Sequence, residues 1–500
     1  MSSDPLHTSR PSPWLTAAAL TIASLPLLYF TLKTGIHGDV WWDWATGQWI
    51  WHHHAVPVTD PWSWSRRGHV WFAHEWLLNL MLYAATRWWG MAGIVLWSIV
   101  PGVLLMSILW RWQTERVPAH YGWHALWLVG ASWILAAFYG HRPQDWAYPL
   151  LVWWLFVLDR YRRTGRSPWA VWSLPVVMLF WVNAHGSFFL GMGFLVFSAA
   201  WAFITPQGWM NPRARWTLTI LAGLSILATW LNPHGWSLWP AMLALSQGAG
   251  TAASLTGEWY SPNFHYAAVA LAYMAILALS VLAIWVGHRR PRWFDGFYWL
   301  GFYFAALHNQ RFLADAALWF PVWMATYGSE AMARLPWRTP WRRMSRFVLG
   351  IWGAVTLIAV GFAVGPALHG PLTAHALQEP VGAVAWMKHH HETTRVFNDF
   401  SWGGYLIAQG IAPWMDGRGL LFGSAPKPSI ARQYRTVVFL SSGNPWPILR
   451  RWHPDVFLLP PSVPLAGLLA SQPHWHVAYR TAFAEVIVAP AHWATSPIAH

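Results

Sequence analysis

Long apolar runs alternate with short polar turns over the first three quarters of the chain. The first run, 14–32, is about long enough to cross a ~30 Å hydrocarbon core as a helix. Further runs of the same character follow, so the pattern predicts about eleven membrane-spanning helices. The expected spans lie at 14–32, 91–109, 123–139, 146–158, 169–182, 188–204, 216–231, 266–286, 293–307, 312–327 and 347–364.

Arginines gather in alternate turns between these runs. Because short cytoplasmic loops accumulate Lys and Arg, the basic turns are expected inside the cell. The first span follows Arg10 and precedes no small-residue cleavage pattern, which indicates an uncleaved anchor with a cytoplasmic N-terminus. The chain is therefore expected to be a multi-pass protein of the cell membrane. The basic turns include Arg111 and Arg116, 160–166, Arg213 and Arg215, 289–292, and 334–346.

One apolar stretch, 75–89, does not fit this alternation as a span. It places Glu75, Asn79, Tyr83 and Arg87 on one side of a helix and apolar residues elsewhere, which is typical of an amphipathic helix in the outer interface. The alternative is a short twelfth span, which would move the 160–166 cluster outside. Residues 36–90 are therefore predicted to form an outer loop with interfacial helices.

The character of the chain changes after the last apolar run. Short apolar segments read as strands at 395–399, 404–408, 436–440, 455–459 and 484–488, and a helical run precedes them at 380–391. The pattern predicts an all-α membrane domain at 1–366 and a small α/β domain at 367–500, which an odd number of spans places outside the cytoplasm. Its Asp416-Gly417-Arg418 segment is interpreted as a tight turn after a strand.

Composition supports the same class. Hydrophobic residues make up 56% of the chain and charged residues only 10%, which is typical of an integral membrane protein. The formal charge of +14 does not indicate nucleic-acid binding, because that function needs a soluble basic face. The absence of Cys excludes disulfides, thiolate metal sites and Cys nucleophiles. Walker and dinucleotide motifs are also missing, which argues against a nucleotide-driven pump.

The turns expected outside carry carboxylate, imidazole and amide groups, in contrast to the arginine-rich turns inside. Ionisable groups at membrane depth are costly and usually mark a functional site or a water-filled cavity. Several such turns on one face predict a shared cavity. The candidate residues are Asp39, Asp43, His74, Glu75, His141, Arg142, Gln144, Asn183, His185, Asn232, His234, Glu258 and Arg311.

A colinear set of short motifs runs through nearly the whole chain, at 39–42, 57–63, 74–77, 142–144, 183–186, 232–235, 403–406 and 416–418. A first span, an Asp opening an outer loop and an amphipathic helix ending in Gly90 resemble the GT-C superfamily of polytopic glycosyltransferases. The chain is similar in particular to the bacterial branch with protein O-mannosyltransferases and the lipid A aminoarabinose transferase. An uncharacterised glycosyltransferase-like group of bacterial membrane proteins is closer still, although Asp43 stands where that group is expected to have His.

The resemblance implies transfer of a sugar from a polyprenyl-phosphate donor, with inversion, to a lipid, glycan or protein acceptor outside the membrane. A phosphate leaves as a stable anion, so one carboxylate to deprotonate the acceptor and cations to hold the phosphate are sufficient. Asp39 is the expected general base, with Asp43 as the alternative. Arg142 and Arg311 are candidates for the phosphate, because guanidinium groups hold its oxygens in pairs. The remaining candidates are expected to line the acceptor or sugar pocket.

No cofactor is expected, and a divalent cation shared by Asp39, Asp43 and His74 is the alternative. A transporter with an outer polar vestibule is a competing function. Transporters place polar, broken helices near the bilayer midplane and often repeat them in both halves, whereas this chain has them at one edge and without a repeat. A membrane scaffold is the other competitor, but an anchor needs neither so many spans nor a polar cavity.

Overall fold

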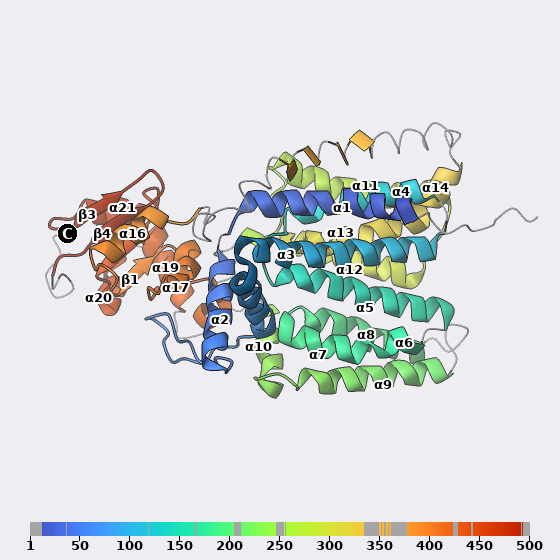
Figure 1. The fold of residues 1–500 in the computed structure, drawn as a ribbon, viewed down its shortest axis with the longest axis horizontal. Coiled ribbons are helices and arrows are strands. Elements are labelled where there is room, and N and C mark those ends of the chain that lie inside the picture. The colour runs from blue at the N-terminus through green and yellow to red at the C-terminus, as the bar shows by residue number, and fades with distance from the viewer. Residues whose placement is uncertain are drawn as a thin grey trace, which may run out of the picture.

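The computed structural model describes residues 13–493 with gaps at 37, 119, 166–167, 205–211, 247–254, 256, 335–349, 352, 355–356, 359, 362–377, 424–428, 442–443 and 492. Most helices lie lengthwise in a bundle, and a smaller unit with a sheet covers one end of it (Figure 1). The bundle contains α1 Pro13–Thr34, α3 Trp76–Arg116, α4 Tyr121–Ala136, α5 Gln144–Thr164, α6 Pro168–Trp172, α7 Leu174–Ala184, α8 Phe188–Ile204, α9 Pro212–Thr229, α11 Ala267–Gly287, α12 Trp293–His308, α13 Leu313–Trp323 and α14 Ser329–Arg334.

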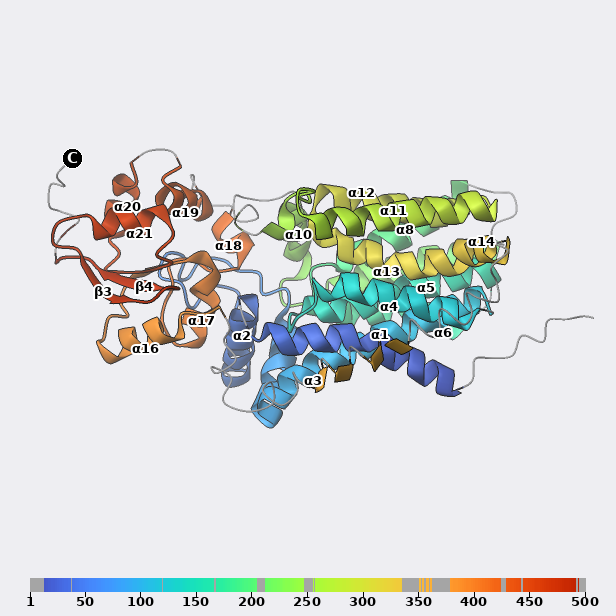
Figure 2. The same cartoon turned by 90° about the horizontal axis from the view of Figure 1, so that it is seen from above.

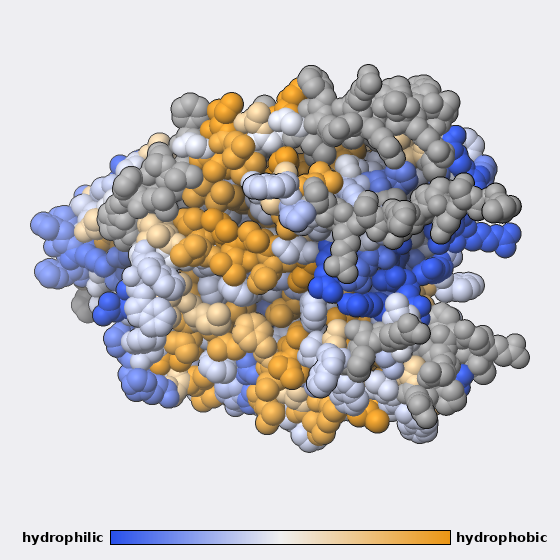
Figure 3. All heavy atoms as spheres, turned by 45° about the vertical axis from the view of Figure 1, so that its right-hand side comes forward, coloured by the Kyte–Doolittle hydropathy of each residue, from blue (hydrophilic) through white to orange (hydrophobic). Residues whose placement is uncertain are grey.

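Three described helices combine the length and hydropathy needed to cross a membrane: Pro13–Lys33, Trp76–Arg116 and Ala267–Gly287. Shorter apolar helices lie at Trp169–Ala184, Phe188–Ile204 and Ala214–Thr229. Large apolar side chains such as Leu271, Met274 and Phe304 are exposed on the bundle, and Figure 3 shows apolar residues gathered over its flank. The chain is therefore a mostly helical membrane protein. The total of about eleven spans stays a prediction, and the expected span at 347–364 lies largely outside the described residues.

Helix α2, Asp39–His53, lies across the end of the bundle and packs against the first part of α3 (Figures 1 and 2). Gly90 interrupts α3 with a φ of 56°, a left-handed value that glycine adopts without strain. The segment before this kink is the expected amphipathic helix, and the segment after it is an expected span. The predicted interfacial arrangement of 36–90 therefore has its counterpart in α2 and the first part of α3.

The smaller unit surrounds a four-stranded sheet with strand order β1-β2-β4-β3. Strands β1 and β2 are parallel, and the pairs β2–β4 and β3–β4 are antiparallel. Its elements are α16 Val381–His389, β1 Val396–Asn398, α17 Gly403–Ala408, α18 Gly419–Gly423, α19 Ile430–Phe439, α20 Trp446–Trp452, β2 Val456–Leu459, α21 Pro464–Ala470, β3 His476–Arg480 and β4 Glu485–Val488.

Two expected strands of this unit are helices. The segment 404–408 belongs to α17, and 436–440 overlaps the end of α19. In α19 the buried residues Ile430, Tyr434, Val437 and Val438 recur at helical spacing. The segment 436–440 contains only the apolar end of this amphipathic helix, and a short apolar run of that kind resembles a strand. Strand β3 was not predicted, because its residues are largely exposed and lack the apolar run of a buried strand.

A buried ion-pair network ties the helices together at the end of the bundle away from the sheet. Arg116 of α3 bonds to Asp159 of α5 at 2.7 Å and to Asp295 of α12 at 2.8 Å, and Tyr327 donates to Asp295 at 2.6 Å. A buried charge is tolerated when it is paired and hydrogen-bonded, as here. The network therefore joins helices whose apolar surfaces alone would leave their relative positions loosely specified.

We expect Gly47→Ala to destabilise the protein. A Cβ at Gly47 would overlap the backbone carbonyl of Asn79 and lie 2.7 Å from Tyr83 Cβ, so α2 and α3 would have to separate. Overpacking of this kind costs ~1–3 kcal/mol. The measurement is thermal unfolding of purified protein in detergent, with Gly130→Ala as the control because a Cβ there meets nothing within 4 Å. Equal midpoints for the two variants would contradict the close helix contact.

Candidate active site

A cavity of about 360 Å³ lies where the end of the bundle, α2 and the sheet-containing unit meet. Its walls come from α2, the loop before α3, the start of α5, the turn after α7, the start of α13 and the segment 417–420. Polar groups from segments far apart in the sequence thus face one space. The candidates that line it are Asp39, Asp43, His74, Glu75, Arg142, Gln144, His185, Glu258 and Arg311.

Four other candidates do not line this cavity. His141 is buried between Ser98, 2.9 Å from its Nδ1, and the carbonyl of Thr31, 3.1 Å from its Nε2. Asn183 accepts from Trp76 Nε1 at 2.8 Å and donates to two backbone carbonyls. These two side chains connect helices. The remaining two, Asn232 and His234, form a turn: the Asn232 side chain accepts from the His234 amide, and the His234 ring packs on Phe72.

The structure also places residues in the cavity that the sequence reasoning missed. Asn79, Tyr148, Trp259 and Asp315 line it from the bundle side. Asn79 already stood on the polar face of the expected amphipathic helix, and Asp315 follows Arg311 by one helical turn, so helical spacing was the available signal. The sheet-containing unit adds Phe400, Gly417, Arg418, Gly419 and Leu420.

Asp39 is the first residue of α2 and stands at the junction of the two units. Its Oδ1 accepts from Trp42 Nε1 at 3.2 Å. A Cβ at Gly417 would overlap the same oxygen. The backbone of the sheet-containing unit therefore lies so close to this carboxylate that only glycine fits at position 417. Burial in the cavity raises the pKa of Asp39 above its ordinary value, although nearby Arg142 opposes the shift.

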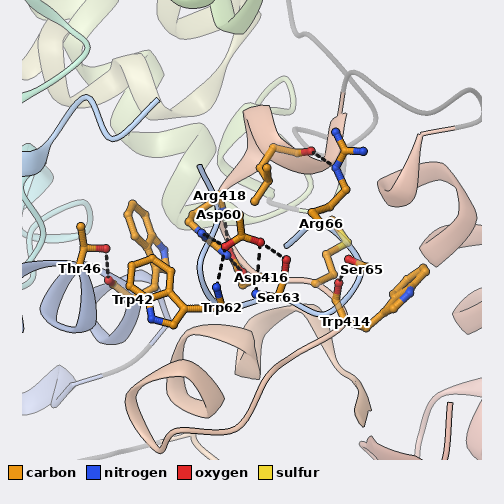
Figure 4. Close-up of polar contacts among 12 residues, drawn as sticks. Trp42, Thr46, Asp60, Trp62, Ser63, Ser65, Arg66, Trp414, Asp416 and Arg418 are labelled. Atoms are coloured by element: carbon orange, nitrogen blue, oxygen red, sulfur yellow. Dashed lines mark hydrogen bonds and ion pairs between the residues drawn. The ribbon is translucent and has the colours of Figure 1, made fainter. Parts of the chain in front are cut away.

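Arg418, which follows Gly417 in the chain, lies at the centre of a cluster of polar contacts (Figure 4). The buried Arg418 guanidinium donates to Asp60 Oδ1 at 2.7 Å and to Asp416 Oδ2 at 2.6 Å. It also stacks against Trp62 and Trp71, with ring centroids 5.0 and 4.8 Å away. Asp60 belongs to the loop after α2, so this cluster joins that loop to the sheet-containing unit. The segment 416–418, expected as a tight turn after a strand, lies in an irregular stretch between α17 and α18, and Gly417 and Arg418 build part of the cavity wall.

Glu75 is held between two histidines. Its Oε1 lies 3.5 Å from His74 Nε2 and 3.3 Å from His185 Nε2. The backbone amide of Ser187 donates to His185 Nδ1 at 3.1 Å, so the proton of the neutral ring sits on Nε2 and points to Glu75. His74 Nδ1 lies 3.1 Å from the Phe72 carbonyl and must donate to it. His74 can therefore donate to Glu75 only as an imidazolium.

Burial and charge act in opposite directions on this group. Burial disfavours protonated His74, but the Glu75 carboxylate and the hydrogen bonds outweigh it and raise the His74 pKa. Burial likewise opposes ionisation of Glu75, yet His74 and His185 leave its pKa below the usual range. For His185 burial dominates and lowers the pKa to about 4. The group thus consists of an ion pair beside a neutral imidazole.

The two arginines of the cavity differ in their partners. Arg142 Nη1 is 2.6 Å from Glu258 Oε1, so its charge is compensated. Arg311, in the short helix η4 Gln310–Phe312, donates to the Gln144 amide oxygen at 3.2 Å and stacks on Trp259 at 4.3 Å. Within the described residues it forms no ion pair with a carboxylate. Arg311 is therefore the cation of this cavity that is ready for an anionic ligand.

Across the part of the chain that the structure describes, no group of three or more His, Asp or Glu side chains is arranged to hold a metal ion. Asp39, Asp43 and His74, the residues of the alternative with a shared divalent cation, do not form such a group among the described residues.

No protein-family model matches the sequence, and no curated protein matches it either. Solved structures do match. They include an oligosaccharyltransferase of Archaeoglobus fulgidus in the apo form, with a TM-score of 0.51, 12% identity, and coverage of 89% of this chain and 70% of that one. Another structure of that organism's enzyme, AglB, is a complex with an inhibitory peptide and a dolichol-phosphate, with a TM-score of 0.52, 11% identity and coverage of 90% and 69%.

ArnT from Cupriavidus metallidurans, bound to undecaprenyl phosphate, matches over 96% of this chain and 98% of its own length. The TM-score is 0.55 and the identity 11%. AglB and ArnT are both GT-C glycosyltransferases. The chain therefore has the GT-C fold, and the resemblance seen in its motifs is confirmed at the level of the fold.

Removing the Arg418 charge should unfold the junction between the two units. In Arg418→Leu the carboxylates of Asp60 and Asp416 stay buried without their cation, which costs ~3–5 kcal/mol. The exposed pair of Arg111 and Glu115 offers the control, because Arg111→Leu should cost less than ~1 kcal/mol. Thermal unfolding of both variants measures the difference. Equal losses would show that the Arg418 cluster does not hold the units together.

The contribution of His185 to stability should fall as the pH drops from about 6.5 to 4. The folded protein holds His185 neutral, with a pKa of about 4, whereas the unfolded chain binds a proton there near pH 6.5. The unfolded state therefore binds more protons in this window. His185→Gln should flatten the slope of the unfolding midpoint against pH. His74→Gln is the contrasting variant, because its raised pKa adds stability that is lost as the pH rises. An unchanged slope in His185→Gln would contradict the assignment.

Proposed function

We propose that the chain is a membrane glycosyltransferase that moves a sugar from a polyprenyl-phosphate donor to an acceptor hydroxyl. The observation that carries this proposal is the cavity at the end of the bundle. It combines a carboxylate with raised pKa, Asp39, and a cation, Arg311, that forms no ion pair with a carboxylate of the described residues. Two solved proteins of the same fold are complexes with dolichol-phosphate and with undecaprenyl phosphate. Their ligands support a polyprenyl-phosphate donor here.

Asp39 acts as the general base. It takes the proton of the acceptor hydroxyl while the acceptor oxygen forms a bond to the anomeric carbon of the donor sugar. The bond between that carbon and the phosphate oxygen breaks, and its electron pair leaves with the phosphate. A carboxylate whose pKa is raised towards neutral pH is a better base than a solvated one. A single displacement of this kind inverts the anomeric centre.

Arg311 holds the departing phosphate. Its guanidinium is oriented by the Gln144 amide and by the face of Trp259, which leaves further N–H groups for phosphate oxygens. Arg142 is bound to Glu258 and acts on Asp39 by its charge instead, since it favours the ionised form of that carboxylate. The two arginines predicted for the phosphate thus take different roles.

An apolar groove of about 460 Å³ adjoins the polar cavity. Phe189 and Met242 line both spaces, so the groove and the cavity lie next to each other. Residue Met242 belongs to α10, Leu238–Ser246, at the cavity end of the bundle. We assign the polyprenyl chain to this groove, with its phosphate in the cavity. The groove is lined by Phe189, Met192, Gly193, Val196, Ile226, Trp236, Trp239, Met242 and Leu243.

The cavity faces the outside of the cell membrane in this proposal. The arginine-rich C-terminal ends of α3 and α5 and the basic turn after α11 lie at the opposite end of the bundle from the sheet-containing unit (Figures 1 and 2). Because basic turns favour the cytoplasmic side, the cavity and the sheet-containing unit are placed outside. An outward cavity suits transfer to a lipid, glycan or protein of the cell envelope.

Purified protein should transfer radiolabelled sugar from an undecaprenyl-phosphate donor to a membrane lipid, glycan or protein fraction. Asp39→Asn should lower the rate by ~10²–10⁴-fold, because the proton acceptor is lost. Arg311→Gln should lower both the rate and the affinity for undecaprenyl phosphate.

Arg111→Gln, far from the cavity and exposed, is the matched control and should stay fully active. Donors covering neutral and amino sugars should be compared in parallel. The proposal is wrong if the wild type turns over none of these donors and also fails to bind undecaprenyl phosphate.

A further inference from the structure

The close crossing of α2 and α3 brings two polar side chains together inside the cavity. Asp43 lies one turn before Gly47 on α2, and Gly47 packs on the backbone of Asn79 in α3. Because only glycine fits at this contact, the distance between the two helices is set by backbone atoms. The side chains of Asp43 and Asn79 both line the cavity, and each residue is 1% exposed.

Apart from their contact with each other, these two side chains carry buried polar atoms without hydrogen-bond partners among the described residues. They are Asp43 Oδ1 and both polar atoms of the Asn79 amide. Buried polar groups are normally satisfied, so each exception needs an explanation. Asn183 shows the usual case in the same region, since its amide makes three hydrogen bonds. Unsatisfied atoms on a cavity wall are explained if a ligand supplies the missing hydrogen bonds.

The surrounding charges indicate which kind of ligand fits. Burial, then Glu75 and Asp39, raise the pKa of Asp43 well above its ordinary value, while the Arg142 charge and the Asn79 side chain oppose them. His74 and His185 face the Glu75 carboxylate rather than Asp43. A carboxylic acid beside a carboxamide offers both donors and acceptors and no net charge. Such a pair matches neutral hydroxyl groups, each of which donates and accepts.

We infer that Asp43 and Asn79 form a subsite for the hydroxyl groups of a neutral sugar carried by the lipid donor. The inference rests on the proposed transferase function and extends it. It gives Asp43 the role of binding the sugar, while Asp39 accepts the proton and Arg311 holds the phosphate. The sugar subsite and the phosphate subsite are thus built from different walls of one cavity.

The ligand-free protein provides the first test, in which the identity of the sugar plays no part. Asn79→Leu replaces an unsatisfied amide by an apolar group of similar size, so the thermal unfolding midpoint should rise. The control Asn183→Leu removes a satisfied amide and should lower it. A fall of similar size in both variants would overturn the inference, because it would show that Asn79 is already satisfied.

The second test compares the binding of undecaprenyl phosphate with that of undecaprenyl-phosphate mannose and glucose. Wild-type protein should bind the sugar-bearing lipids at least about tenfold more tightly than undecaprenyl phosphate, because the sugar hydroxyl groups then pair with the polar groups of Asp43 and Asn79. Asn79→Leu should lose this difference and keep its affinity for undecaprenyl phosphate. Asp43→Asn retains a donor and an acceptor and should keep the difference, whereas Asp43→Leu should lose it.

The outcomes separate the two proposals. If undecaprenyl phosphate binds but Asn79→Leu leaves the sugar preference intact, the subsite is wrong and the transferase stands. If undecaprenyl phosphate does not bind to wild-type protein, the transferase falls, and the subsite falls with it. A preference for an amino-sugar lipid alone that is lost in Asp43→Asn would also overturn the inference, because it would show that Asp43 acts as an anion.

Discussion

The buried guanidinium of Arg418 is the contact on which the geometry of the site depends. It neutralises Asp60 from the loop after α2 and Asp416 from the sheet-containing unit, and two indole rings enclose it. Burial of the two carboxylates without this cation would be strongly destabilising. The same turn presses Gly417 against Asp39, so the ion pairs that join the two units also set the position of the proposed base.

Some charged groups of the cavity are paired with an opposite charge and others are not, and the proposed chemistry depends on the unpaired ones. The Glu75 carboxylate is balanced by His74, and Arg142 is balanced by Glu258. Asp39, Asp43 and Arg311 have no such full compensation: burial raises the pKa of both aspartates, and Arg311 pairs with no carboxylate of the described chain. Buried ionisable groups without full charge compensation destabilise the ligand-free protein. They can serve in binding or catalysis when a ligand supplies the missing partners.

The fold explains how a lipid-linked substrate could meet such a polar site. The apolar groove and the polar cavity share Phe189 and Met242, so a chain lying in the groove would bring its phosphate to the cavity wall. Helix α2 lies across the end of the bundle and packs against the first part of α3. Asp39 and Asp43 thereby gain a buried setting without lying inside a membrane-spanning helix.

Local apolar periodicity and length were enough to predict the membrane class, most helix positions and the strands β1, β2 and β4. The sequence also indicated which turns carry polar chemistry. Only the tertiary structure decided which of those residues share a cavity. His141 and Asn183 looked equivalent to His185, yet their hydrogen bonds to Thr31 and Trp76 make them structural. Such partners lie far apart in the sequence, and local patterns do not encode which distant groups meet when helices pack.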